Sequence, residues 1–439
     1  MTTDYSAQYA KKLIRKEDVI SLIHDGDRIV CHGGATSFME VLDEHRYELH
    51  GVKLFTMFLL GKYFHFLEDD VREHIVHHAA FVSTPVREAW KNGERPEINI
   101  CHFSETDDYV REYAKPTVVG VQCTPMDEEG YFYMGYNSMG HQPAVEMADR
   151  VIVHVNRALP KILGECNKLH ISRVTAIYEE EMTLDAVPPL QYSEADRRAA
   201  QLIAERIPDG ATIQIGVGRV PDAMTPFLQE HRHLGVHTEV FTQSLMDLMK
   251  AGVIDNSRKT LLPGKSVFSF TAFTRASQDI YDFVDGNPAT EMFPISFVND
   301  PRIIAQNDNL ISVNSALSVD LTGQVCSEAL GFMPYSGTGG QLDFVRGARW
   351  SKGGQSYIVI NSVAEKRDGS RISKIDLTLP LGSPVTTPRT DVDCIVTEYG
   401  VAELRYKSIS ERAKALIAIA HPDFREELTA KAKKVGYLI

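Results

Sequence analysis

The sequence contains the same order of predicted elements twice, 184 residues apart. Residues 25–55 form a strand-like segment, a glycine turn, a helical segment and a second strand-like segment, and residues 209–239 follow the same order. This succession is the building unit of parallel α/β sheets. The repeat therefore predicts an α/β fold made of two related domains.

Two adjacent prolines predict where the two domains meet. Pro188 and Pro189 interrupt the periodic pattern shortly before a new helix, for which Ser193 provides an N-terminal cap. The chain of 439 residues has the length expected of two domains. We therefore expect an N-terminal domain at 1–188 and a C-terminal domain at 189–439.

Composition excludes several classes of partner. The chain has 46 Lys and Arg against 59 Asp and Glu, so its formal net charge is −13. Such a charge repels nucleic acid and anionic membranes. The apolar runs are too short to cross a bilayer, and the first 16 residues lack the pattern of a secretory signal. We expect no nucleic-acid or membrane partner and a cytoplasmic location.

Motifs for metal, hydrolase and ATP chemistry are missing from the sequence. The six cysteines are far apart, with no C-x-x-C pair and no Cys/His spacing suited to zinc, which predicts reduced thiols and no metal site. The histidines at 74–78 lack the H-E-x-x-H order, and neither a G-x-S-x-G elbow nor a phosphate-binding Walker loop occurs. Serine hydrolysis and ATP chemistry therefore have no support.

Two glycine-rich segments are candidate binding loops. The strand-like residues 213–215 lead into Gly216, Val217 and Gly218, and residues 336–340 contain three glycines in five positions. Glycine allows backbone N–H groups to approach a ligand closely, but it serves equally well in an ordinary turn. Each segment alone is compatible with binding and with packing.

Glu239 is a candidate nucleophile because it ends the short predicted strand 234–239. Strand ends are where α/β sheets meet their ligands. In the first copy of the repeat, Phe55 stands at the corresponding place. A solvated loop carboxylate is the alternative interpretation of Glu239, and Glu328 and Glu398 are rivals by the same logic.

Several long strings together resemble the acetyl-CoA hydrolase/transferase family of class I CoA-transferases. They are VTEYGVAEL at 396–404, ALIAIAHPDF at 415–424 and SGTGGQLDFVRGA at 336–348. The likeness covers nearly the whole chain and is nearest to 4-hydroxybutyrate, butyrate and itaconate CoA-transferases. It implies two open α/β CoA-transferase domains with the active site between them, in a homodimer or higher homo-oligomer without a metal or prosthetic group.

The resemblance also implies roles for individual residues. The family's catalytic glutamate falls on Glu239. Its CoA-contacting segments fall on Gln214, Ile215, Gly216, Val217, Gly218, Asn314, Met333, Gly337, Gly339 and Gly340. Basic residues from Lys366 to Lys374 are either a solvated loop or partners for the phosphates of CoA.

The implied reaction moves CoA between a short-chain acyl-CoA (acetyl-, butyryl- or succinyl-CoA) and a small carboxylate such as 4-hydroxybutyrate, butyrate or itaconate. It proceeds by a ping-pong route through a glutamyl-CoA thioester. Alternatives are an acyl-CoA hydrolase that uses the same glutamate and a non-catalytic CoA-binding protein.

Arg219 departs from the small residue that relatives carry after the glycine turn. Because arginine binds carboxylates through paired hydrogen bonds, we expect it either to bind the distal carboxylate of a dicarboxylic substrate or to face outward at a helix start.

Overall fold

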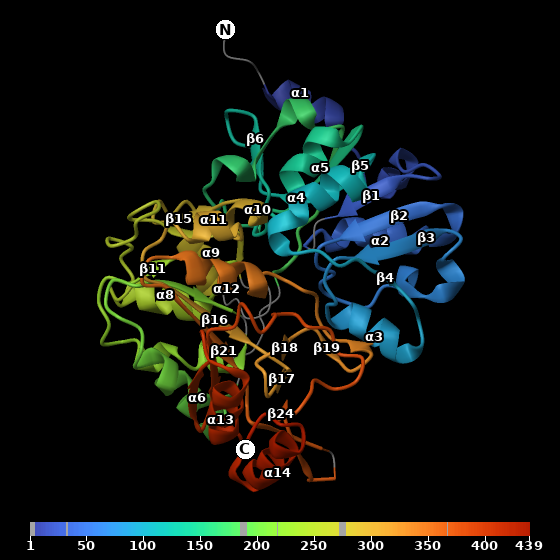
Figure 1. Cartoon of the computed structure of the whole chain (residues 1–439). Coiled ribbons are helices and arrows are strands. Elements are labelled where there is room, and N and C mark those ends of the chain that lie inside the picture. The colour runs from blue at the N-terminus through green and yellow to red at the C-terminus, as the bar shows by residue number, and fades with distance from the viewer. Residues whose placement is uncertain (1–4, 32–33, 185–190, 217, 272–277, 367) are drawn as a thin grey trace. The chain divides into compact units, whose positions relative to one another are not determined.

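The computed structural model forms two compact units (Figure 1). The first unit comprises Met1–Val187 and Phe268–Phe297, and the second comprises Pro188–Val267 and Val298–Ile439. The structure describes residues 5–31, 34–184, 191–216, 218–271, 278–366 and 368–439.

The predicted domain boundary between residues 188 and 189 lies outside the described residues. The division into 1–188 and 189–439 therefore stays a prediction. The segment Phe268–Phe297, which the sequence analysis placed in the C-terminal domain, belongs to the first unit.

The first unit contains a sheet of seven parallel strands in the order β4-β3-β2-β1-β5-β7-β9. Strands β1 to β4 lie side by side in Figure 1. The strands are β1 (Arg28–Cys31), β2 (Val52–Thr56), β3 (Ile75–Ala79), β4 (Glu97–Ile98), β5 (Val118–Cys123), β7 (Arg150–Val155) and β9 (Ala176–Glu179). Every residue of β5 is buried, as expected of a parallel sheet that is covered on both faces.

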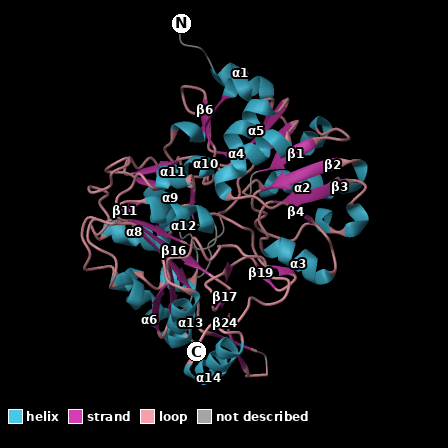
Figure 2. Ribbon diagram, viewed as in Figure 1, coloured by secondary structure: helices cyan, strands magenta, loops and turns pink. Residues whose placement is uncertain are grey.

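Helices and a small two-stranded sheet accompany the large sheet of the first unit (Figure 2). The helices are α1 (Tyr5–Lys12), α2 (Thr36–Glu44), α3 (Thr84–Asn92), α4 (Thr106–Asp108), α5 (His141–Met147) and α9 (Gln278–Val284). Strands β6 (Tyr131–Tyr133) and β8 (Lys168–His170) pair antiparallel. In the core, Phe38 and Leu42 of α2 join Ile29 of β1 and Leu54 of β2.

The second unit contains a six-stranded sheet in the order β11-β10-β16-β21-β25-β26. The strands are β10 (Thr212–Ile215), β11 (Gly235–Val236), β16 (Leu310–Ser315), β21 (Gln355–Val359), β25 (Cys394–Thr397) and β26 (Gly400–Glu403). Only the pairing of β25 with β26 is antiparallel in this sheet. The parallel α/β architecture predicted from the repeat is thus confirmed in each unit.

Seven helices and several short strands surround this second sheet in the part of the chain that is described. The helices are α6 (Glu194–Ala204), α7 (Arg219–Asp222), α8 (Gln243–Lys250), α11 (Pro301–Ile304), α12 (Gln341–Trp350), α13 (Ile409–Ile419) and α14 (Pro422–Lys434). The short strands are β17 (Ser318–Asp320), β18 (Val325–Cys326), β19 (Ala329–Leu330), β20 (Met333–Pro334), β22 (Val363–Glu365), β23 (Arg371–Ser373) and β24 (Ile375–Asp376). Leu416 of α13 packs with Ile358 and Ile395 of the sheet.

The remaining short elements belong to neither of the two large sheets. They are β12 (Val240–Phe241), β13 (Ser266–Phe268), β14 (Phe270–Thr271), β15 (Thr290–Met292) and α10 (Ile295–Val298). Among the described residues, no helix is long and apolar enough to cross a membrane.

The repeat is confirmed for the first strand and corrected for the second. Strands β1 and β10 begin at Arg28 and Thr212, which are 184 residues apart. Arg28 pairs with Lys53, but Thr212 pairs with Gly235, because the connection between the strands is two residues shorter in the second copy. The structural counterpart of Phe55 is therefore His237 and not Glu239, as the sequence offset had suggested.

The second sheet reverses its winding between β10 and β16. From β10 the chain continues to β11 on one side, and β16 lies on the other. Ligands of open α/β sheets bind beyond the carboxyl ends of the strands at such a reversal. The glycine turn predicted at residues 216–218 follows β10 at this point.

Candidate active site

Glu239 lies three residues beyond β11, in the loop that precedes β12 and α8. The side-chain amide of Asn299 donates a hydrogen bond of 2.6 Å to its Oε1 atom. Asn299 is completely buried, and its Nδ2 atom also lies 3.5 Å from Oδ2 of Asp343. A carboxylate that is partly accessible to solvent is thereby held in one orientation.

The surroundings of Glu239 favour its protonated form. Burial raises the pKa of its carboxyl group to about 7, the hydrogen bond from Asn299 opposes this shift, and the carboxylate of Asp343 adds to it. A carboxylate with such a pKa is more basic than an exposed one and remains substantially ionised at neutral pH.

Gly340 lies directly against this carboxylate. A Cβ atom on Gly340 would overlap Oε1 of Glu239 and Nδ2 of Asn299. Gly340 immediately precedes α12, so the N-terminal end of that helix begins beside Glu239. Only glycine fits here, and its backbone is in contact distance of the candidate nucleophile.

His237 links the segments that carry Glu239 and Asn299. Its Nε2 atom lies 2.8 Å from the carbonyl oxygen of Val298 and must be the donor, because a carbonyl only accepts. Burial lowers the pKa of His237 to about 3, so the ring stays neutral. The bond fixes the chain two residues before Glu239 to the residue that precedes Asn299.

The glycine turn after β10 lies close to the end of β16. A Cβ atom on Gly216 would lie 3.0 Å from Oδ1 of Asn314, and one on Gly218 would lie 2.8 Å from Oγ of Ser315. Packing therefore favours glycine at both positions, whether or not they also contact a ligand.

Gln214 and Asn314 bind one another through their side chains. Each donates a hydrogen bond of 3.1 Å to the amide oxygen of the other, and Oγ of Ser312 donates to Gln214. These bonds tie the carboxyl ends of β10 and β16 together. The sequence expectation that these two amides contact CoA is untested, and their bonding shows a structural role.

The second glycine-rich loop is tied to the same strand end. The side-chain amide nitrogen Nε2 of Gln341, the residue after Gly340, donates a hydrogen bond of 3.0 Å to the backbone carbonyl of Ser315. Gly339 has a φ of +61°, a left-handed conformation that suits glycine. Gly218, Gly340 and Glu239 thus belong to one continuous set of contacts at the carboxyl edge of the sheet.

The other predicted site residues lie around these segments. Ile215 is the buried last residue of β10, Gly337 is half-buried in the second loop, and Met333 is a half-buried residue of β20 that pairs with Leu330. Val217 lies outside the described residues. Arg219 begins α7, is exposed, and has no hydrogen bond or ion pair with the residues that the structure describes.

Both oxygens of the rival carboxylate Glu398 accept hydrogen bonds within the protein. The backbone N–H and the hydroxyl of Ser362 donate to its two carboxylate oxygens at 3.0 and 2.5 Å. The structure therefore separates Glu239 from Glu398. It also adds Asn299 and Asp343, which the sequence analysis missed. Asp343 lies within the string at 336–348, whereas nothing in the sequence singles out Asn299.

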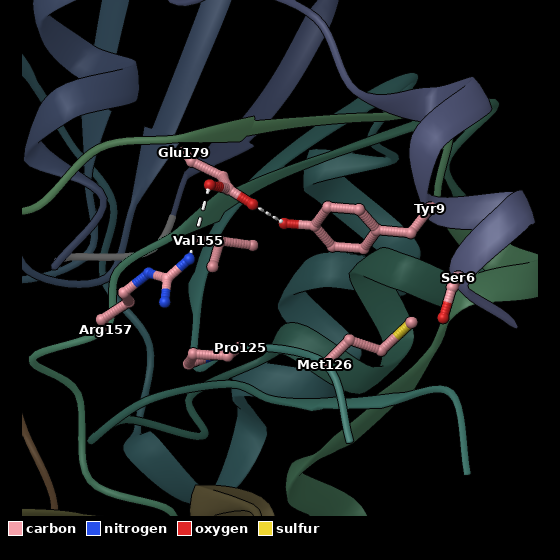
Figure 3. A pocket seen from close by; sticks show the side chains of 7 residues that line it. All are labelled: Ser6, Tyr9, Pro125, Met126, Val155, Arg157 and Glu179. Carbon is pink, nitrogen blue, oxygen red and sulfur yellow. Dashed lines mark hydrogen bonds and ion pairs between the residues drawn. The ribbon is translucent and has the colours of Figure 1, made fainter. Parts of the chain in front are cut away.

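The first unit has a pocket of its own, of about 230 Å³, beyond the carboxyl ends of β5, β7 and β9 (Figure 3). The hydroxyl of Tyr9 donates a hydrogen bond of 2.5 Å to Glu179, whose other oxygen lies 3.9 Å from the guanidinium of Arg157. Burial and the neighbouring Glu179 raise the pKa of Tyr9. None of the predicted site residues lines this pocket, and its polar groups satisfy one another.

Comparison with protein families decides the relationship. The acetyl-CoA hydrolase/transferase N-terminal domain matches residues 1–189, and the C-terminal domain of the same family matches residues 276–432. The chain belongs to the acetyl-CoA hydrolase/transferase family. The predicted resemblance is thereby confirmed. Among the described residues, no group of three or more His, Cys, Asp or Glu side chains is arranged to hold a metal ion.

Similar proteins of this family are CoA-transferases. The chain is 39% identical to the 4-hydroxybutyrate coenzyme A transferase of Clostridium kluyveri, over 97% of this chain and 98% of that protein. It is 38% identical to the succinyl-CoA:cyclohexane-1-carboxylate CoA transferase of Geobacter metallireducens, over 98% and 97%. The crystal structure of 4-hydroxybutyrate CoA-transferase from Porphyromonas gingivalis matches with a TM-score of 0.83 and 33% identity, over 98% and 100%.

Proposed function

We propose that this family member is an acyl-CoA:carboxylate CoA-transferase with Glu239 as its nucleophile. The observation that carries the proposal is the carboxylate of Glu239, held by Asn299 against the backbone of Gly340 in surroundings that raise its pKa to about 7. The named CoA-transferases that resemble the whole chain support the reaction class.

The proposed chemistry begins with Glu239. One carboxylate oxygen attacks the thioester carbonyl of the acyl-CoA, which forms a mixed anhydride and releases the CoA thiolate. The thiolate then attacks the glutamyl carbonyl, so that the acyl group leaves as a free carboxylate and Glu239 carries CoA as a thioester. An incoming carboxylate reverses both steps, which regenerates Glu239 and yields the new acyl-CoA.

The neighbours of Glu239 have defined tasks in this scheme. Asn299 orients the attacking oxygen, and its donor N–H remains beside that oxygen as charge moves during attack. We place the backbone at Gly339 and Gly340 at the developing oxyanion, because the absence of a side chain at Gly340 opens the approach to Glu239. Gly337, Met333 and the turn from Ile215 to Gly218, including Val217, are proposed to line the path of CoA. Gln214 and Asn314 would act by fixing the ends of β10 and β16.

The names of the relatives guide the choice of substrates. We propose acetyl-, butyryl- or succinyl-CoA as donors and 4-hydroxybutyrate, butyrate or itaconate as acceptors, with no prosthetic group. A cytoplasmic homodimer or higher homo-oligomer is the proposed form of the protein. The role of Arg219 in binding a dicarboxylic substrate stays a prediction.

Trapping of the covalent intermediate tests the proposal. The enzyme is incubated with butyryl-CoA or succinyl-CoA, reduced with sodium borohydride, digested and analysed by mass spectrometry. Reduction of a glutamyl thioester at Glu239 is expected, and E239Q must remain unmodified. A modified residue other than Glu239, or unaltered CoA transfer by E239A, would contradict the assignment and favour a different nucleophile.

Hydrolysis by the same glutamate is the second candidate, because the matching family includes hydrolases. The two activities differ in what removes CoA from Glu239, and exclusion of water from that intermediate decides between them. Thiol release from acyl-CoA is measured with and without a carboxylate acceptor. Transfer predicts no accumulation of free thiol in either case, with at most one equivalent of carboxylate released per enzyme without acceptor and new acyl-CoA formed with it, whereas a hydrolase would release thiol continuously in both.

A further inference from the structure

Two cations at the carboxyl edge of the second sheet have no hydrogen-bond or ion-pair partner among the described residues. They are Lys374, between β23 and β24, and Arg219 at the start of α7. Neither side chain makes a hydrogen bond or ion pair with any residue in the described parts of the chain. Arg219 is exposed, and Lys374 is half-buried.

The backbone of Lys374 is fixed. Its N–H donates a hydrogen bond of 2.9 Å to the carbonyl of Ser362, and its own carbonyl accepts one of 2.9 Å from Val319. Burial lowers the pKa of its ammonium group, the charges of Glu398 and Asp196 oppose this shift, and the nearby charge of Arg219 adds to it. A cation held in this way without a partner is costly, and a bound anion would offset that cost.

The nearest acidic groups do not neutralise these cations directly. The carboxylate of Glu398 accepts both of its hydrogen bonds from Ser362. The carboxylate of Asp196 accepts hydrogen bonds from Ser193, the N-terminal cap of α6, and from the side-chain amide of Asn361. Both acids act on Lys374 through their charge, but neither forms a hydrogen bond or ion pair with Lys374 or Arg219 in the described structure.

The position of Lys374, which is bonded to Ser362, relative to Glu239 limits the ligand. Glu239 follows β11, whereas Ser362 and Glu398 follow β21 and β25, which are three and four places along the sheet. At the usual strand spacing this corresponds to roughly 14–19 Å. The pantetheine arm of CoA spans such a distance between its sulfur and its pyrophosphate. The short bridge between the two carboxylates of succinate does not.

We propose that Lys374 and Arg219 form an anion site that binds a phosphate group of CoA while its thiol lies at Glu239. The inference rests on the proposed function. It assigns Arg219 to the phosphate and not to a distal carboxylate of the acyl group. Lysine contributes a compact charge and arginine a planar set of donors, a combination that suits phosphate oxygens.

The test compares donors with and without phosphates in the full-length enzyme. K374M and R219Q are assayed with acetyl-CoA, with acetyl-dephospho-CoA and with S-acetylpantetheine, at saturating butyrate. For each variant we expect the KM for acetyl-CoA to rise about tenfold, with kcat nearly unchanged, because one charge-assisted bond is lost. The KM for S-acetylpantetheine should not change, and the dephospho donor shows which phosphate is bound.

Controls separate this inference from folding and from the proposed chemistry. K414M removes an exposed charge from α13 and should behave as wild type, and K374R should retain a wild-type KM. If K374M does not fold, R219Q provides the same test, because Arg219 is exposed. Equal changes for all three donors, or none, would overturn the phosphate site. A loss of preference for succinate over butyrate as acceptor in R219Q, with an unchanged KM for acetyl-CoA, would also overturn it. Borohydride labelling of Glu239 in wild type and variants reports separately on the proposed mechanism.

Discussion

Asn299 donates a hydrogen bond of 2.6 Å from its side-chain amide to Oε1 of Glu239, although the two residues are 60 positions apart in the chain. The neutral ring of His237 holds Val298, the neighbour of Asn299, and so keeps the two segments together. Asn299 is completely buried, and its position is therefore set by the fold. The nucleophile and its donor form one rigid unit.

N299A should reduce CoA transfer about 10- to 100-fold. The variant removes a hydrogen bond to a charged group, which is worth about 1.5–3 kcal/mol. Since that bond favours the ionised form, its loss should also raise the pKa of Glu239 above the wild-type value. Kinetics of CoA transfer from butyryl-CoA to a carboxylate acceptor between pH 5 and 9 would measure both effects.

A merely structural role for Asn299 is distinguishable. It would lower the midpoint of thermal unfolding and the amount of active enzyme while leaving the pH profile in place. An alkaline displacement of the profile with an unchanged midpoint identifies Asn299 as a positioning residue for Glu239.

The rate of the first acyl transfer should depend on pH around the pKa of Glu239, which is about 7. Only the carboxylate attacks the thioester, so kcat/KM for the acyl-CoA should rise about tenfold per pH unit below this value and level off above it. Pre-steady-state release of butyrate from butyryl-CoA is the direct measurement. A plateau that extends down to pH 5 would show that the site does not disfavour the charged form.

E239Q should be more stable than wild type at alkaline pH. The folded protein raises the pKa of Glu239 from 4.5 to about 7, so the folded state binds a proton more tightly than the unfolded state does. Below the pKa of the unfolded state this difference does not change the free energy of unfolding. As the pH rises towards 7 it lowers the free energy of unfolding by an increasing amount, up to about 3 kcal/mol. The neutral amide avoids this loss of stability and can still accept the bond from Asn299.

Denaturant unfolding of both proteins at pH 4.5 and pH 8 would check this difference. The stabilising effect of E239Q should appear at pH 8 and be much smaller at pH 4.5. An equal difference at both pH values would exclude titration of Glu239 as its cause.

The sequence predicted the architecture through local patterns. The strand at residues 212–215 and its counterpart at 28–31 have the expected offset, and Ser193 caps α6 as predicted, through reciprocal bonds with Asp196. Such features depend on residues that are close in sequence. The second repeated strand was misaligned by two residues, because a shorter connection changes the register and leaves the apolar pattern intact.

The site could be predicted only in part, because some of its contacts join residues that are far apart in the sequence. Glu239 and the glycines at 337–340 belong to recognisable strings, but Asn299 reaches Glu239 only through tertiary packing. Gln214 and Asn314 carry side chains suited to a ligand, yet on adjacent strands they satisfy one another. Whether a polar residue is available for binding depends on its neighbour across the sheet, and a single sequence does not specify that neighbour.

G340A should abolish transfer while the protein still folds. The added methyl group would occupy the space of the Glu239 carboxylate and the Asn299 amide, so one of them must move. Gly340 has a φ of −106°, which alanine adopts without strain, and the effect is therefore steric and local. We expect a loss of at least about 100-fold in kcat/KM, since a nucleophile displaced by about 1 Å loses that much.

G339A provides the comparison for this prediction. Gly339 has a φ of +61°, so alanine there strains the backbone, and its main expected effect is a loss of stability of about 1 kcal/mol. The two variants should therefore separate in thermal unfolding and in borohydride labelling of Glu239. If G340A still forms the glutamyl adduct at the wild-type rate, the carboxylate does not need the position beside Gly340, and the proposed geometry of attack is wrong.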